Sequence, residues 1–320
     1  VVADAPTLAD YIKANPDLGL QVVGEPFTDE LYGIAVNKEK PEVRDALIAA
    51  LAALQENGTY DEIFNAWFGA PEAAAAEGEE EAAAAPEGDG VTFIFGRGAD
   101  GVGLDPAVIT DGESFRVTNQ GCESLLAYDG ETTNVIPSLA ESWESNEEGT
   151  EWTFTLRQGV TFHDGTEFDA DAVVFNFERW WDPANPYHFE EQVFEYWDYM
   201  WGGFRGDSIV TGIEKVDDFT VKFTLSEPLA PILANMAMPM FSIASPAAIE
   251  EYGVDYGTPE VGYVCTGPYA FVEWVTGESI TLSRNEDYWG ENPGNVETII
   301  IRTIPDNSAR FLALQAGEVH

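Results

Sequence analysis

The chain of 320 residues carries 58 acidic and 14 basic side chains, which gives a formal net charge of −44 at pH 7. This excess of negative charge argues against nucleic acid as a partner, because no basic face can be assembled to meet the phosphates. The hydrophobic share of 45% suffices for one large or two ordinary domains. The acidity indicates either a high-salt environment or a generally acidic exported proteome, and both remain open.

The two ends of the sequence indicate a piece of a longer protein. The chain begins with strand-like residues 1–4 rather than with Met, and it stops at 317–320, just after a predicted helix. We expect it to be cut at both ends, so the lack of a visible signal peptide says nothing about export. No apolar run reaches the roughly 18 residues that a membrane-spanning helix needs.

Residues 1–69 form the first predicted unit. Pro41 suits the first position of a helix, and Gly58 is placed to end that helix. Thr59 and Glu62 have the spacing of a capping box, which predicts a second helix directly afterwards.

Five short stretches of this unit resemble the C-terminal third of the family 3 solute-binding proteins, which are amino-acid receptors. They are 2–7, 23–27, 32–36, 57–61 and 67–69. The resemblance implies that Asp4 binds the α-ammonium group of a ligand, a role that suits a carboxylate in a dry cleft. The alternative is an aspartate that caps a helix at the end of a strand, and the ligand role is favoured.

Residues 70–90 differ from both neighbours in composition. The stretch is rich in Ala, Glu and Gly and contains no aromatic or basic residue. Because it cannot bury enough apolar surface to become ordered, we interpret it as a linker whose Ala/Glu runs form transient helix. The second unit then covers 91–320.

The second unit is predicted to contain both strands and helices. In chain order we expect a strand at 91–95, a helix at 113–126, strands at 152–156 and 160–162, a helix after Asp169, a strand at 220–225, a helix around Leu233, a hairpin at 269–283, a strand at 296–304 and a helix at 308–316. Trp152, Phe154 and Leu156 alternate with threonines, the pattern of a strand with one buried face. Asp169 and Asp306 are placed to cap the helices that follow them.

The aromatic stretch 187–204 has two interpretations. Interleaved with acidic residues, it fits a surface on which sugars or peptides stack, or packing beneath a helix and loop segment. Packing is the commoner situation and is favoured. Cys122 and Cys265 also leave two possibilities, one disulfide or two separate buried thiols, because their spacing fits no zinc motif.

The sequence contains little that supports catalysis. His163 and Asp164 look like a catalytic pair, but Gly165 follows them and a turn is favoured. The glycine-rich loop at 96–103 lacks the Gly-Lys-Ser/Thr of a phosphate loop. The abundant acids and tryptophans leave one alternative function, a secreted protein that binds or hydrolyses carbohydrate with paired carboxylates. We expect no enzyme, no cofactor and no metal site.

The second unit resembles the family 5 extracytoplasmic solute-binding proteins, the receptors of peptide, dipeptide and nickel ABC importers. The matching pieces are 139–143 (LAESW), 152–157, 159–165 (GVTFHDG) and 168–179, followed by 185–188, 216–218, 266–269, 285–290 and 304–306. The pieces occur in a dense and ordered series, so the resemblance covers roughly 91–320.

This resemblance implies a fold and a function. The implied fold class is α/β, with type II periplasmic-binding-protein-like lobes, incomplete at both chain ends, and mixed sheets flanked by helices. The implied function is noncatalytic: a periplasmic or extracellular receptor, anchored as a lipoprotein, takes a peptide or other small solute to membrane permease subunits. Peptides, nickel complexes, haem and oligosaccharides all remain possible ligands.

The resemblance also implies a ligand site at the mouth of the cleft between two lobes. The loop after the first strand, the end of the following helix and the turn before the hairpin would line it. The expected residues are Gly103, Leu104, Asp105, Phe115, Thr266 and Gly267.

Overall fold

The computed structural model describes residues 48, 54–55, 58–60, 88–129 and 133–320. The chain divides into two units, Val1–Ala85 and Pro86–His320. In the first unit, Gly58 lies in a turn with φ of 78°, a conformation that favours glycine, between residues that are helical, as expected of a helix-ending glycine. The other elements expected in 1–69 and the linker as far as residue 87 lie outside the described residues.

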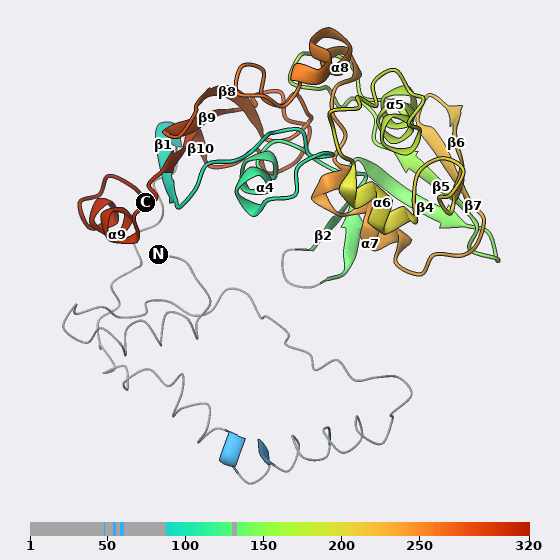
Figure 1. Cartoon of the computed structure of the whole chain (residues 1–320), viewed down its shortest axis with the longest axis horizontal. Helices are drawn as coiled ribbons and strands as arrows, with labels where there is room; N and C mark the ends of the chain where they lie inside the picture. The colour runs from blue at the N-terminus through green and yellow to red at the C-terminus, as the bar shows by residue number, and fades with distance from the viewer. Residues whose placement is uncertain (1–47, 49–53, 56–57, 61–87, 130–132) are drawn as a thin grey trace. The chain divides into compact units, whose positions relative to one another are not determined.

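The second unit contains a mixed four-stranded sheet at one end (Figure 1). Its order is β1-β10-β9-β8, with β1 (Gly88–Arg97) parallel to β10 (Val296–Thr303) and the other pairs antiparallel. β9 (Ser279–Arg284) and β8 (Tyr269–Val275) form the expected hairpin. β10 is a central strand, as predicted, whereas β1 begins at Gly88, inside the stretch that we interpreted as linker.

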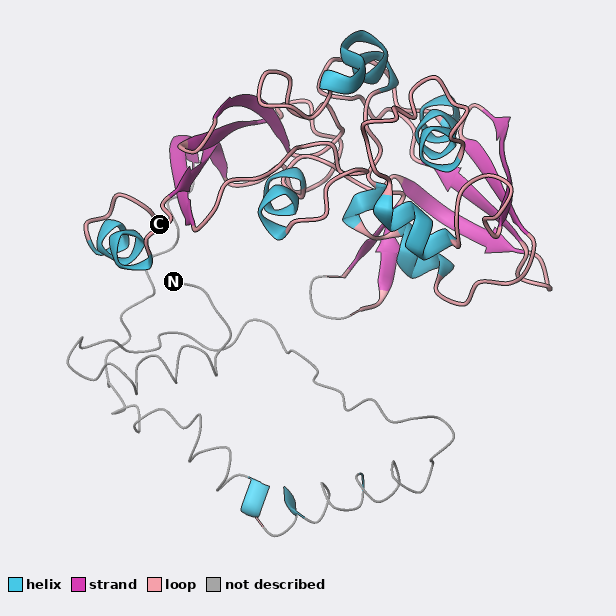
Figure 2. Cartoon of the chain, viewed as in Figure 1, coloured by secondary structure: helices cyan, strands magenta, loops and turns pink. Residues whose placement is uncertain are grey.

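A second, antiparallel sheet stands at the other end of the unit (Figure 2). Its order is β4-β5-β7-β6, formed by Ala140–Ser145, Glu151–Leu156, Thr220–Leu225 and Val210–Asp217. Phe154 and Leu156 point inward and are buried, which confirms the alternation in the sequence. The strand expected at 160–162 is wrong: only Thr161 forms a bridge, to Glu167, because the chain turns back there.

Helices cover this second sheet and continue toward the first (Figure 1). They are α5 (Ala170–Trp181), α6 (Glu195–Trp201), α7 (Ile232–Met236) and α8 (Pro246–Tyr252), with short 3₁₀ turns η2 (Pro239–Phe241) and η3 (Gly253–Asp255). Asp169 caps α5 by accepting the Ala172 N–H at 3.0 Å. Asp306 caps α9 (Asn307–Gln315) in the same way, by accepting the Ala309 N–H at 2.7 Å. Both predicted caps are confirmed.

The aromatic stretch mostly packs in the core. Trp197 and Trp201 stack at 5.3 Å between ring centroids, and both are buried with Phe194. Phe177 of α5 packs edge-to-face on Phe223 of β7 at 4.8 Å. Core packing rather than a stacking surface therefore explains most of these rings.

The helix expected at 113–126 is much shorter in the structure. α4 spans Gly112–Thr118, and the chain re-forms regular structure only in β2 (Leu126–Tyr128), which pairs with β3 (Val135–Pro137). Gly121 shows the reason: a Cβ there would lie 2.2 Å from the Tyr269 carbonyl oxygen. The chain leaves the helix to pass in close backbone contact beside β8.

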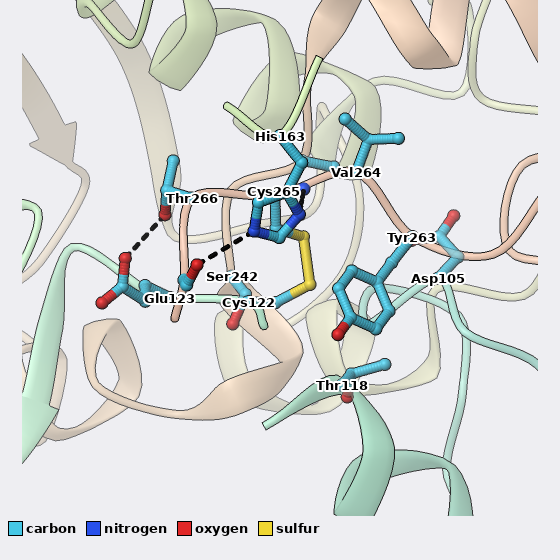
Figure 3. The surroundings of a disulfide bond; sticks show 12 residues. Asp105, Thr118, Cys122, Glu123, His163, Ser242, Tyr263, Val264, Cys265 and Thr266 are labelled. Atoms are coloured by element: carbon cyan, nitrogen blue, oxygen red, sulfur yellow. Dashed lines mark hydrogen bonds between the residues drawn. A yellow bond between two sulfur atoms is a disulfide. The ribbon is translucent and has the colours of Figure 1, made fainter. Parts of the chain in front are cut away.

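Cys122 and Cys265 form a disulfide with 5.0 Å between their Cα atoms, which decides between the two possibilities left open (Figure 3). The bridge joins the segment after α4 to the segment before β8, across 143 residues of sequence. Such a bond persists in oxidising compartments, as expected of an exported protein.

We expect the stability of the protein to rise with salt. With 58 acidic and 14 basic side chains, repulsion between like charges opposes the folded state, and added ions screen that repulsion. Melting temperatures measured from 0.05 to 2 M NaCl should therefore increase steadily, whereas an uncharged osmolarity control should not reproduce the low-salt part of the rise. A flat profile would contradict this prediction.

Candidate functional site

The loop between β1 and α4 is fixed to the rest of the unit at Leu104. The Leu104 N–H donates to the Gly257 carbonyl at 2.8 Å, and Gly257 has φ of 86°, which favours glycine. A Cβ on Gly257 would lie 2.5 Å from the Asp105 nitrogen, so the two segments touch through their backbones. Gly103 keeps part of its surface, whereas Leu104 is fully buried.

Asp105 forms a buried ion pair. Its Oδ2 accepts from Nη2 of Arg179 in α5 at 2.5 Å, and its Oδ1 accepts from the Ala107 N–H at 3.2 Å. Asp105 is 1% exposed and Arg179 is not exposed at all. In this conformation the side chains of Leu104 and Asp105 offer no surface to a solute, so Asp105 holds the loop, and contact with a ligand stays a prediction for both.

Phe115 lies on α4 and is half-buried. Its ring meets the ring of Tyr196 in α6 edge-to-face, with 6.1 Å between centroids. This pair connects α4 to the helical layer over the second sheet and leaves part of both rings accessible.

Thr266 and Gly267 lie beside the disulfide, where two distant segments cross (Figure 3). The Gly267 N–H donates to the Gly121 carbonyl at 2.8 Å, and a Cβ on Gly267 would lie 2.6 Å from that same peptide group. The Thr266 hydroxyl donates to Oε2 of Glu123 at 2.8 Å. Both predicted residues are buried, and they are tied to the residues on either side of Cys122.

Glu123 is the site residue that the sequence reasoning missed. Besides Thr266, it accepts from the Tyr288 hydroxyl at 2.7 Å and from the Trp289 indole N–H at 2.8 Å. Burial raises the pKa of the Glu123 carboxyl, although these donors and nearby Arg157 act in the opposite direction. The guanidinium of Arg157 stacks over Trp289 at 4.5 Å. Thr266, Tyr288 and Trp289 all stand in motifs singled out in the sequence, but their common partner does not.

A surface hollow of about 380 Å³ lies next to Glu123. Polar and apolar surfaces contribute equally to its wall, which includes Cys122 of the disulfide. The lining residues are Asn119, Cys122, Glu123, Ser124, Leu126, Ala127, Tyr128, Ser138, Ala237, Pro239 and Ser242. The hollow has room for a small polar group beside a carboxylate.

His163 and Asp164 form a turn, as favoured. The Gly165 N–H donates to the Phe162 carbonyl at 2.8 Å. Asp164 accepts from the Thr166 N–H at 2.9 Å and from the Ser245 hydroxyl at 2.5 Å, while both ring nitrogens of His163 bond to the 265–267 segment. The two side chains are therefore engaged with different partners rather than arranged as a catalytic pair.

In the described part of the chain, no group of three or more His, Cys, Asp or Glu side chains is placed to hold a metal ion. Within the same residues, no helix is both long and apolar enough to cross a membrane. Asp4, the ligand residue expected in the first unit, lies outside the described residues.

Comparison with known proteins gives consistent relatives. The chain is 35% identical to the heme-binding protein A of Haemophilus influenzae over 238 residues, which are 71% of this chain and 42% of that protein. It is 34% identical to the dipeptide-binding protein of Escherichia coli over 241 residues, 71% of this chain and 43% of the relative. The chain thus spans less than half the length of these relatives.

Solved structures agree with the sequence relatives. The periplasmic binding protein DppA of Helicobacter pylori, in complex with the peptide STSA, matches with a TM-score of 0.67 and 37% identity over 73% of this chain and 46% of that one. HbpA2 of Haemophilus parasuis matches with a TM-score of 0.65 and 31% identity over 72% and 46%. The fold is accordingly that of type II periplasmic binding proteins, as predicted. Residues 134–320 match the model of the middle region of family 5, and the chain therefore belongs to the family 5 bacterial extracellular solute-binding proteins.

Proposed function

We propose that this chain is part of the substrate-binding component of an ABC importer, with a peptide or oligopeptide as its solute. The observation that carries the proposal is the likeness to a peptide complex, the Helicobacter pylori structure with STSA, at 37% identity. The family is one of receptors rather than enzymes, and we infer that this chain likewise has no catalytic role. The permease subunits in the membrane would be its protein partners.

The second unit would form the first lobe of the receptor. The loop at Gly103–Asp105, the α4 residue Phe115 and the Thr266–Gly267 turn would face the solute, with Asp105 acting through its ion pair to Arg179. A second lobe would close over the solute by a hinge movement and exclude water. Export to the periplasm or cell exterior is supported by the disulfide, and we propose a lipid anchor.

For the remainder of the chain we propose two further assignments. Residues 1–69 would be the C-terminal part of a family 3 amino-acid receptor with Asp4 as its ammonium ligand, and 70–90 a linker. The support is the sequence resemblance and the turn at Gly58, which lies where a helix was expected to end. The carbohydrate alternative loses its main support, because most of the rings of 187–204 are committed to core packing.

Calorimetric titration with mixed di- and tripeptides tests the proposal. The complete protein should bind with micromolar affinity, and the present 320-residue chain should bind weakly or not at all. With one lobe, one face of the peptide stays in water, where exposed ion pairs contribute only about 0–1 kcal/mol. Equal affinities of the two proteins would overturn the two-lobe interpretation. If the complete protein bound no peptide, the solute would instead be a sugar, a metal chelate or haem.

A further inference from the structure

His163 holds the segment Cys265–Gly267, here called the binding turn, through its backbone and its ring. Its backbone N–H donates to the Cys265 carbonyl at 2.8 Å. Its ring adds two contacts, 3.3 Å from the Cys265 nitrogen to Nδ1 and 3.0 Å from Nε2 to the Gly267 oxygen. One side chain thus spans the whole turn.

These two ring contacts determine where the proton lies. The Cys265 N–H can only donate, so Nδ1 of His163 must be unprotonated to accept from it. The Gly267 carbonyl can only accept, so Nε2 must carry the proton. The imidazole is therefore the neutral Nε2–H tautomer, assigned from its partners.

Protonation would break this arrangement on one side. A proton on Nδ1 of His163 would point at the Cys265 N–H, so a hydrogen bond would become a contact between two donors. The other ring bond, to Gly267, would persist. At Cys265 the binding turn would lose the ring contact and keep only the backbone hydrogen bond from His163, while the ring contact at Gly267 would remain.

The surroundings keep the ring neutral at pH 7. Burial lowers the pKa of His163, while the hydrogen bond to the Gly267 carbonyl and the neighbouring Asp164 act in the opposite direction. Three other titratable groups lie nearby. The ring of Tyr263 lies 5.9 Å from the His163 ring, and the hydroxyl of Tyr256 is 4.0 Å from Cys265 Sγ. Glu123 accepts a hydrogen bond from Thr266 of the binding turn. Asp164 itself is held by Thr166 and Ser245.

We propose that His163 is a positioning residue of the solute site: its neutral ring fixes the binding turn, and protonation of the ring loosens the turn and weakens solute binding. The solute part of this inference rests on the proposed function, because it takes the turn to contact the solute. The hold on the turn follows from the contacts alone.

The direction of the pH effect follows from the lowered pKa. The folded protein resists protonation of His163, whereas the unfolded chain takes up the proton near the ordinary value of 6.5. Between these two values the unfolded state binds more protons, so stability rises with pH there. The contribution of His163 is complete above about pH 6.5 and is lost as the pH falls toward the folded-state pKa.

His188 provides a matched control. Burial lowers its pKa as well. Its Nδ1 lies 2.7 Å from the Arg179 carbonyl, an acceptor, so protonation of the ring leaves this hydrogen bond in place. His188→Gln removes a titrating imidazole from a position away from the binding turn.

The experiment measures affinity of the complete protein for an equimolar dipeptide mixture between pH 5 and pH 8. Wild type and His188→Gln should bind more weakly as the pH falls, by about five- to tenfold once the His163 ring is protonated, which is the effect of one lost hydrogen bond. His163→Gln keeps a donor for Gly267 but has no titrating acceptor, so its affinity should be reduced and nearly independent of pH. A His163→Gln variant with the wild-type pH profile would overturn the proposal.

Amide hydrogen exchange and ¹⁵N spectra of the imidazoles provide a readout that needs no solute. In wild type, the Nε2–H tautomer should be seen for His163 at pH 7.5. Protection of the Cys265 amide, corrected for intrinsic rates, should fall over the pH range in which the ¹⁵N signals show the His163 ring taking up a proton. The Nδ1–H tautomer, or protection that does not change as the ring becomes protonated, would refute the role of His163. A complete protein that binds no dipeptide at any pH would remove the proposed ligand, while these measurements would still decide whether His163 holds the turn.

Discussion

Replacing both Cys122 and Cys265 with alanine should lower the free energy of unfolding by about 2–5 kcal/mol. The reason is chain entropy: the bridge closes a loop of 143 residues, and the unfolded chain regains that freedom when the bridge is lost. Guanidinium denaturation of the variant and of oxidised wild type measures the difference.

Reduction of wild type is the matched control for the cysteine variant. Wild type treated with a thiol reductant should unfold at the same denaturant concentration as the double alanine variant. The reductant should not change the unfolding of that variant, which has no disulfide. Because the bridge lies next to Glu123 and Thr266, solute affinity should fall in both cases. A double variant as stable as oxidised wild type would show that the bridge constrains little.

Replacing Asp105 with alanine should cost about 3–5 kcal/mol of stability, because it leaves Arg179 buried without its carboxylate. Nη1 of Arg179 already lacks a hydrogen-bond partner. Without the carboxylate, the remaining neutral acceptors cannot compensate the buried positive charge of the guanidinium. Chemical denaturation should show the loss directly. Asp105→Asn keeps an acceptor for the Ala107 N–H and should cost less.

The same variant separates the two roles considered for Asp105. If Asp105 only supports the fold, the Asp105→Ala protein loses stability first, and its affinity for the solute falls only as the Gly103–Asp105 loop loosens. A direct ligand residue would instead lose affinity while the melting temperature hardly changes. Asp287→Ala removes an equal charge from an exposed position and should change stability by no more than about 0.5 kcal/mol. An Asp105→Ala protein as stable as this control would contradict the buried ion pair.

Glu123 illustrates why the site could be predicted only in part. The family resemblance implies that Thr266 lines the site, and its hydroxyl donates to Glu123, a carboxylate that lies 143 residues earlier in the sequence. Tyr288 and Trp289 reach the same carboxylate from 165 and 166 residues away. No local pattern in the segment around Glu123 marks it as the common acceptor, because the pattern exists only after three segments have packed together.

Short-range patterns by themselves determined many elements of the second unit. The alternation in β5, the start of α5 at Asp169 and the start of α9 at Asp306 depend on neighbours within a few residues, and the structure has all three as expected.

Tertiary structure alone decided the rest. α4 ends at Thr118 because Gly121 must pass against Tyr269, and Asp105 became an internal counterion because Arg179, 74 residues away, is buried beside it. Burial and long-range backbone contact override local propensity, since an unpaired buried charge or a steric clash costs more than a turn of helix contributes.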